Sequence, residues 1–163
     1  MNTNSTVIRL ARNSDIPAIA DIWYRSGRTA YSFLPDWKEL TPQRSQEIIA
    51  KYILPHKQTW LALESNHPIA FLCLQPQRSG SGDRSDLPLV DRLYVYPSRQ
   101  GEGIGTQILN HSKALHPEGL ELYTHQANHP ARRFYEKRGF LPIAFGLSPH
   151  PESAPDVKYR WTQ

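Results

Sequence analysis

The chain has 163 residues, of which 39% are hydrophobic and 21% are charged, and it carries a formal net charge of +4. This length and composition predict a single globular domain, residues 1–163, with a substantial core. No apolar run approaches the length of a membrane span, and the polar N-terminus lacks the core of a signal peptide. The basic residues are scattered and are not interleaved with aromatic ones, so neither nucleic acid nor a membrane is an expected partner.

The first half of the chain predicts a strand, two helices and a hairpin. Val7 to Leu10 has the pattern of a strand, and Ser14 is the expected cap of a helix. Thr41 begins a second helix after a loop over residues 31–37. The runs 59–64 and 69–74 predict a hairpin. A polar, glycine-containing stretch, Gln75 to Asp86, predicts a mobile loop.

The cysteine and two closely spaced histidines of the sequence are not expected to act as a nucleophile or as metal ligands. The only cysteine, Cys73, lies inside an apolar run, where burial raises the pKa of a thiol and disfavours a nucleophile. A chain with one cysteine forms no internal disulfide, which is compatible with a reducing cytoplasm. His125 and His129 are four residues apart across a turn, and no third ligand can be named, so no metal site is expected.

Three glycines, Gly101, Gly103 and Gly105, stand between a predicted strand, Leu87 to Tyr96, and an amphipathic helix, Ile104 to Leu115. Glycines at a helix start allow successive backbone N–H groups to converge on a ligand, and the helix dipole adds partial positive charge. This pattern predicts a site for phosphate groups.

The spacing of these residues distinguishes three kinds of phosphate loop. A P-loop requires Lys and then Ser or Thr after its last glycine, but Thr106 and Gln107 stand there. A dinucleotide fingerprint would place its third glycine at Thr106. The remaining pattern, Q-x-x-G-x-G, is satisfied by Gln100, Gly103 and Gly105.

A second motif follows a short strand, Leu120 to Thr124. Residues 128–140 read NHPARRFYEKRGF, in which Asn128 can cap a helix and Gly139 can form its left-handed exit. Strands are also expected at 141–147 and 157–161. The strand at 120–124 should run parallel to the strand before the glycines, because a crossover helix joins them.

Together, the Q-x-x-G-x-G loop with its upstream Val95-x-Pro97 and the N-x-x-A-x-x-F-Y-x-x-x-G-F segment resemble the GNAT superfamily of N-acetyltransferases. The resemblance extends from Leu87 to Phe145. It implies an α/β (α+β) fold, with a mixed, mostly antiparallel sheet of six or seven strands and about four helices on both faces. The two parallel strands are expected to splay apart and admit the pantetheine arm of acetyl-coenzyme A.

The resemblance also implies which residues contact this cofactor. The backbone of the strand would pair with the pantetheine amides, and the glycine loop would hold the pyrophosphate. Arg132 would meet phosphates or remain on a solvated helix face. The implied cofactor site consists of Leu93, Tyr94, Val95, Gln100, Gly101, Gly103, Ile104, Gly105, Thr106, Asn128, Ala131, Arg132 and Phe134.

The implied reaction is acetyl transfer to an amine by direct attack, which needs no protein nucleophile. Tyr135 matches the family position that often serves as general acid, although an aromatic core residue is the alternative. Asp91 is the candidate base if it shares a strand face with Leu93 and Val95. A salt bridge with Arg92 and a water relay to a more distant carboxylate are the competing interpretations.

The acceptor is expected between two variable segments, 31–37 and 148–156. Aromatic rings there could enclose an aliphatic stem while a carboxylate meets its ammonium group. The candidate acceptor residues are Tyr31, Phe33, Asp36, Trp37, Glu152 and Asp156. A small-molecule amine and a peptide or protein terminus both fit, as do a monomer and a homodimer. A coenzyme A-binding sensor without catalysis is the alternative function.

Overall fold

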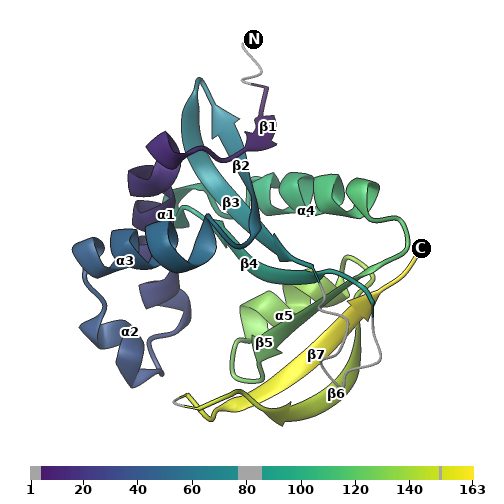
Figure 1. Cartoon of the computed structure of the whole chain (residues 1–163). Helices are drawn as coiled ribbons and strands as arrows, with labels where there is room; N and C mark the ends of the chain where they lie inside the picture. Colours follow the sequence, from purple (N-terminus) through teal and green to yellow (C-terminus); the bar gives the residue numbers. More distant parts are fainter. Residues whose placement is uncertain (1–4, 77–85, 151) are drawn as a thin grey trace.

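The computed structural model describes residues 5–76, 86–150 and 152–163, which form one sheet covered by helices on both faces (Figure 1). The sheet has seven strands in the order β1-β2-β3-β4-β5-β7-β6, and only the β4–β5 pair is parallel. The strands are β1 (Val7–Leu10), β2 (Gln58–Glu64), β3 (His67–Gln75), β4 (Leu89–Val95), β5 (Leu120–His125), β6 (Leu141–Leu147) and β7 (Pro155–Trp161). The predicted fold class is confirmed, and the strand before the glycines pairs in parallel with β5 as expected.

Two hydrophobic clusters attach helices to opposite faces of this sheet. On one face, Ile19 and Ile22 of the first helix pack on Phe71 of β3. On the other face, Ile108 and Tyr135 pack on Leu72 of the same strand. The alternation of side chains along β3 therefore divides the core into two layers. The helices are α1 (Ile16–Ala30), α2 (Pro35–Glu39), α3 (Pro42–Ile48), α4 (Ile104–Leu115) and α5 (His129–Glu136).

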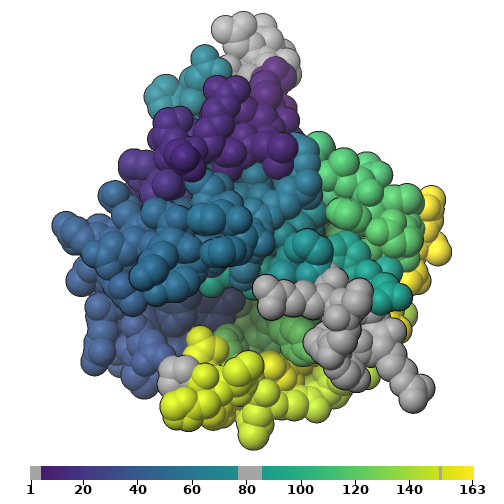
Figure 2. Space-filling view, in the orientation of Figure 1, coloured from purple at the N-terminus to yellow at the C-terminus, as the bar shows by residue number. Residues whose placement is uncertain are grey.

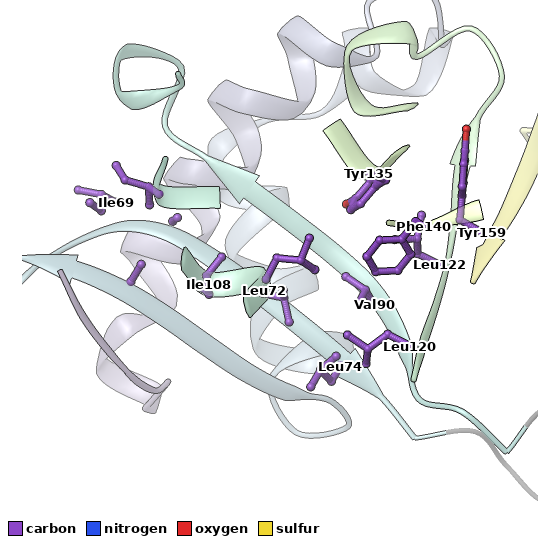
Figure 3. Close-up of a cluster of buried hydrophobic side chains, with 14 of the residues drawn as sticks. Ile69, Leu72, Leu74, Val90, Ile108, Leu120, Leu122, Tyr135, Phe140 and Tyr159 are labelled. Atoms are coloured by element: carbon purple, nitrogen blue, oxygen red, sulfur yellow. The ribbon is translucent and has the colours of Figure 1, made fainter. Parts of the chain in front are cut away.

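The second cluster lies against the C-terminal half of the sheet. Tyr135 of α5 and Phe140 meet edge to face, with ring centroids 5.6 Å apart. Figure 3 shows both rings beside Val90 of β4 and Leu122 of β5. This contact holds α5 over the parallel strands, where the predicted site lies.

The expected boundaries are wrong at two places in the N-terminal half. Ser14 does not cap α1, because a 3₁₀ turn, Asn13–Asp15, precedes the helix and the Asp15 carboxylate accepts from the Arg12 N–H group at 2.7 Å. The predicted loop 31–37 ends in a helix, since Pro35 begins α2. Thr41 does cap α3, accepting from the Arg44 N–H group at 3.1 Å.

The remaining predictions from the first half concern Cys73 and the long loop. Cys73 is buried, and desolvation raises the pKa of its thiol to about 11, as expected for a structural cysteine. The mobile loop predicted for Gln75 to Asp86 falls mostly outside the described residues. None of the helices in the described ranges is long and apolar enough to cross a membrane.

The parallel pairing of β4 with β5 is short. It joins only Leu89 to Glu121 and Val90 to Leu122, after which the two strands diverge. On its other edge, β4 remains paired with β3 as far as Val95. The C-terminal half of β4 therefore has one edge free of a strand partner, as the predicted splay requires.

A β-bulge interrupts β4 at Asp91. Cys73 pairs with Arg92 and Leu74 with Val90, so Asp91 has no partner residue in β3. Val90 and Leu93 consequently reach the same core cluster. The bulge breaks the alternation that was expected to align Asp91 with Leu93 and Val95, so that prediction is wrong.

Asp15 provides a test of the N-terminal packing. Its carboxylate accepts two hydrogen bonds from the Arg9 guanidinium, at 2.8 and 3.0 Å, besides the one from Arg12. We expect Asp15→Asn to lower the free energy of unfolding at pH 7 by about 1 to 3 kcal/mol, because charge-assisted hydrogen bonds are lost. Urea unfolding measures this difference.

The pH dependence of that difference has a defined sign. Hydrogen bonding to Arg9 holds the pKa of Asp15 below its usual value. The stabilisation is therefore present above the unfolded pKa of about 3.9 and disappears as the pH falls through the folded pKa. An equal difference at pH 7 and well below pH 4 would contradict this assignment. Glu47→Gln, which removes the exposed pair with Arg44, is the control and should have little effect.

Candidate functional site

Two cavities open on either side of the β4–β5 divergence and meet there. The first, of about 490 Å³, extends from the glycine loop to α5, and the second, of about 700 Å³, lies beneath α2 and the β6–β7 connection. Figure 2 shows a hollow between the helices of the N-terminal third and the β6–β7 hairpin. The residues that line both cavities are Tyr31, Val90, Asp91, Arg92, Tyr94, Tyr123 and Thr124.

The glycine loop has the conformation that the sequence predicts. Gly101 and Gly103 both have φ of +83°, a left-handed conformation that favours glycine, and Gly103 is the N-cap of α4. The N–H groups of Ile104, Gly105 and Thr106 therefore stand in the first turn, where an α-helix provides no internal partner for them. The loop lines the first cavity, so these donors and the positive end of α4 meet at its wall.

Gly105 differs from the other two glycines, because it leaves room for a neighbouring ring. A Cβ atom there would lie 3.3 Å from the ring of Phe134 on α5. The absence of a side chain leaves room for the Phe134 ring, and Phe134 and Ala131 line the same cavity. Asn128 begins α5 as predicted, because its Oδ1 atom accepts from the Ala131 N–H group at 3.2 Å.

The free edge of β4 forms another wall of the first cavity. The Tyr96 N–H group donates to Ile69 of β3 at 3.0 Å. Because successive residues of a strand point their N–H groups to opposite sides, those of Leu93 and Val95 face away from β3 and toward the gap. The Val95 carbonyl accepts from Ser26 Oγ at 2.8 Å and from Gln100 Nε2 at 3.1 Å. Gln100 thus fastens the glycine loop to the end of β4.

Arg138 is one of three arginines that line this cavity, and unlike Arg92 and Arg99 it forms no salt bridge within the described residues. Its Nε atom donates to Thr106 Oγ1 at 2.8 Å, one guanidinium nitrogen donates to the Phe134 carbonyl at 2.7 Å, and the group lies 3.7 Å above the Phe134 ring. A cation beside the N-terminus of α4 opposes the helix dipole, and a bound anion would compensate both positive charges. The sequence analysis missed Arg138, although it stands four residues after Phe134.

Arg132, which was the expected phosphate ligand, does not line the first cavity. It donates to Tyr159 Oη at 3.2 Å and to the Gln126 carbonyl at 3.3 Å. Its guanidinium therefore braces α5 against β7.

Tyr135 lies at the junction of core and cavity. Its side chain is buried in the second hydrophobic layer, yet it also lines the first cavity. Burial raises the pKa of the Tyr135 phenol above its usual value of about 10. The hydroxyl group therefore keeps its proton at neutral pH, as a donor must.

Thr124 carries an orphaned hydroxyl group where the cavities meet. The Oγ1 atom is buried and has no hydrogen-bond partner in the part of the chain that the structure describes. Buried hydroxyl groups are normally satisfied, so this one points to a polar group supplied by a ligand.

Aromatic and acidic side chains surround the second cavity. Tyr31 stacks on Trp37 at 5.3 Å, and Trp37 meets Trp23 edge to face at the same centroid distance. Burial raises the pKa of the Tyr31 phenol. Of the predicted acceptor residues, Tyr31, Asp36, Trp37, Glu152 and Asp156 line this cavity.

Phe33 is the exception among the predicted acceptor residues. It lines neither cavity, is 44% exposed, and contacts the rings of Tyr31 and His125 from outside. His125, at the end of β5, does line the second cavity, and its Nε2 atom lies 3.4 Å from Glu152. Sequence reasoning had considered His125 only as a metal ligand.

Asp91 borders both cavities but is already paired. Its carboxylate lies 2.6 Å from Lys57 Nζ and also contacts the Arg92 guanidinium. The salt bridge with Arg92, which the sequence left open as the alternative, is therefore present. Arg92 in turn lies over the ring of Trp23.

Curated relatives of this chain are N-acetyltransferases. The peptidyl-lysine N-acetyltransferase YiaC of Escherichia coli K12 is 26% identical over 136 residues, which cover 82% of each chain. The peptidyl-lysine N-acetyltransferase YjaB of the same organism is 27% identical over 134 residues, covering 82% of this chain and 80% of the relative.

Solved structures share the fold. The apo form of E. coli YjaB has a TM-score of 0.73 at 22% identity and covers 96% of this chain and 97% of its own. The PaiA N-acetyltransferase of Thermoplasma acidophilum, solved in complex with coenzyme A, has a TM-score of 0.70 at 16% identity, covering 96% and 99%.

The family model described as acetyltransferase (GNAT) family matches residues 17–140. That span holds the glycine loop, the diverging strands and α5. The chain therefore belongs to the GNAT family of acetyltransferases, which confirms the predicted enzyme class and acetyl-coenzyme A as the cofactor.

Proposed function

We propose that this chain transfers an acetyl group from acetyl-coenzyme A to a primary amine, with both molecules bound at once. The observation that carries this proposal is the meeting of two cavities at the β4–β5 divergence. One cavity carries the donors for a phosphorylated cofactor, and the other has aromatic and acidic walls. Because YiaC and YjaB are named peptidyl-lysine N-acetyltransferases, a lysine side chain of a peptide is the favoured acceptor, ahead of a small-molecule amine.

The residues present fit acetyl-coenzyme A. The first turn of α4 and Arg138 would hold the pyrophosphate, and the free N–H groups of Leu93 and Val95 would pair with the pantetheine arm. The unpartnered Thr124 hydroxyl group is available to a polar atom near the junction. When bound, acetyl-coenzyme A supplies an activated acetyl group as a thioester.

The chain's own groups then have defined tasks. A backbone N–H group on the free edge of β4 can polarise a carbonyl placed in the gap, as an oxyanion-type donor does. Tyr135 holds a proton on Oη and can donate it to the departing sulfur. The Tyr31 and Trp37 rings can enclose an aliphatic stem, while the acidic residues of the second cavity attract its ammonium group.

A coenzyme A-binding sensor without catalysis would need only the first cavity. The second cavity, which shares a wall with the first, therefore favours an enzyme. A screen of amines, amino acids, polyamines, peptide termini and lysine peptides, with released thiol as the readout, tests the proposal. Turnover with a lysine peptide would support it, and coenzyme A binding without turnover on any amine would support the sensor.

The role of Tyr135 can be tested by removing one hydroxyl group. We expect Tyr135→Phe to lower turnover by about tenfold to a thousandfold with folding intact, because the donor to the leaving sulfur is lost. Tyr52→Phe removes the same group from an exposed residue remote from the cavities and should change nothing. Undiminished turnover of Tyr135→Phe would remove Tyr135 from the reaction.

Comparing Arg138 with Arg132, six residues earlier, distinguishes an arginine that binds the cofactor from one that supports the fold. We expect Arg138→Met to weaken coenzyme A binding by about tenfold, because the charge at the α4 N-terminus is lost while the aliphatic stem remains. Arg132→Met, which alters only the brace between α5 and β7, should leave the affinity unchanged. Calorimetric titration at two salt concentrations measures both, and equal affinities for the two variants would contradict the assignment of Arg138.

A further inference from the structure

The end of β5 presents a histidine to the acceptor cavity. Leu122 belongs to the core layer beneath α4 and α5, so alternation along β5 turns Tyr123 and His125 to the opposite face, where the second cavity lies. The imidazole ring meets the ring of Tyr31, which lines both cavities, with centroids 5.4 Å apart. It therefore lies on the side from which an amine would enter, one residue away from the shared wall.

The two ring nitrogens of His125 have different surroundings. Nε2 lies 3.4 Å from the Glu152 carboxylate, in the connection between β6 and β7. Nδ1 is buried, and no hydrogen-bond partner for it is found within the described ranges. This contact is an ion-pair distance longer than a typical hydrogen bond, and a carboxylate on that side favours the tautomer with the proton on Nε2, which leaves the Nδ1 lone pair without a partner among the described residues. Such an arrangement of a carboxylate and an imidazole is how a general base is oriented.

We propose that His125 is the base that removes a proton from the acceptor ammonium group and that Glu152 is its positioning residue. This inference rests on the proposed acetyl transfer. The rings of Tyr31 and Phe33 meet the imidazole edge to face, at centroid distances of 5.4 and 5.8 Å. Phe33 is 44% exposed, so one side of the imidazole is bordered by a ring at the surface of the molecule.

Two acidic side chains of this region, Asp91 and Asp36, are less suited to that task. Asp91 is committed to Lys57 and Arg92, and Asp36 is exposed on α2. A histidine, by contrast, changes protonation within the physiological pH range and can accept and release a proton in each cycle. His125 directly follows Thr124, a residue of the wall that the two cavities share, whereas Glu152 lines only the second cavity.

Each proton and bond of the proposed transfer has a defined donor and acceptor. His125 accepts one ammonium proton at Nδ1, and the freed lone pair forms the C–N bond to the acetyl carbon while the C–S bond breaks. Tyr135 protonates the departing sulfur and regains a proton from the new amide nitrogen through solvent. The products are the amide, the free thiol of coenzyme A and one proton, which His125 releases.

Several titratable groups face the imidazole or share its cavity and must be considered in any pH profile. Tyr31 approaches it from the end of α1, Glu152 from the β6–β7 connection, and Asp156 is its cross-strand partner in β7. Asp36 of α2 and Arg92 of β4 line the same cavity. None of these neighbouring groups is an imidazole, the side chain that ordinarily titrates between about pH 5 and 8.

The kinetic test compares His125→Gln with wild type on a lysine peptide across pH. We expect kcat/KM of the variant to fall about 100-fold at neutral pH, because the base that accepts the ammonium proton is lost. The deficit should shrink toward the lysine pKa of about 10.4, because the substrate then loses its proton unaided. A deficit that is equal at every pH, or smaller than about threefold, would overturn the inference.

His116→Gln is the matched control. It removes another histidine paired with a glutamate, 3.1 Å from Glu118, at the end of α4 and outside both cavities. We expect its pH profile to match that of the wild type. Circular dichroism and thermal unfolding establish that each variant folds.

A second measurement does not depend on turnover. Nitrogen-15 spectra of histidine-labelled protein report the tautomer of each imidazole, and we expect the Nε2-protonated form for His125. Glu152→Ala should reduce that preference, and Glu152→Gln, which retains an acceptor oxygen, should preserve it. A His125 ring protonated on Nδ1 overturns the inference even if the enzyme is active. Failure of all amines to react would instead refute the proposed function.

Discussion

Hydrogen bonding between the parallel strands β4 and β5 ends after two residue pairs, and both cavities exist because it does. Continued pairing would satisfy the Leu93 and Val95 N–H groups within the sheet and would close the space between the layers. Tyr135 and Phe140 pack against one face of the sheet here, and α1 packs against β3 and β4 on the other. A cofactor arm that adds hydrogen bonds along β4 would complete the sheet without closing the passage to the acceptor side.

A second constraint acts at the start of α4, where positive charge gathers at one end of the gap between the strands. Gly103 starts α4 in a left-handed conformation, and the absent Cβ atom of Gly105 admits Phe134, which carries the Arg138 guanidinium above its ring. Unpartnered N–H groups, the helix dipole and an arginine therefore gather at one point with no carboxylate bonded to Arg138 among the described residues. Such an arrangement is stable without a ligand only through cation–π and hydrogen-bond contacts, and it favours a bound anion.

The sequence predicted those parts of the site that depend on local conformation. The glycine loop, the Asn128 cap and the parallel strands follow from neighbouring residues, and they are confirmed. The errors depend on tertiary contacts: the bulge at Asp91 is visible only against β3, and Arg138 reaches the cavity only because α5 ends beside α4. Glu152 and His125 are distant in sequence, and the β6–β7 connection brings them together.

The central claim is that coenzyme A lies along the gap with its pyrophosphate at the start of α4. Calorimetric titration of coenzyme A into Gly103→Glu and Gly103→Asn tests it most directly. A Cβ atom at position 103 meets nothing within 4 Å, so a glutamate makes no steric clash, although the φ of +83° strains it and its negative charge lies where the phosphates would bind. Asparagine tolerates that φ better than glutamate does and adds no charge. The account predicts no measurable binding to the folded glutamate variant and retained binding to the asparagine variant; wild-type affinity in the glutamate variant would contradict it.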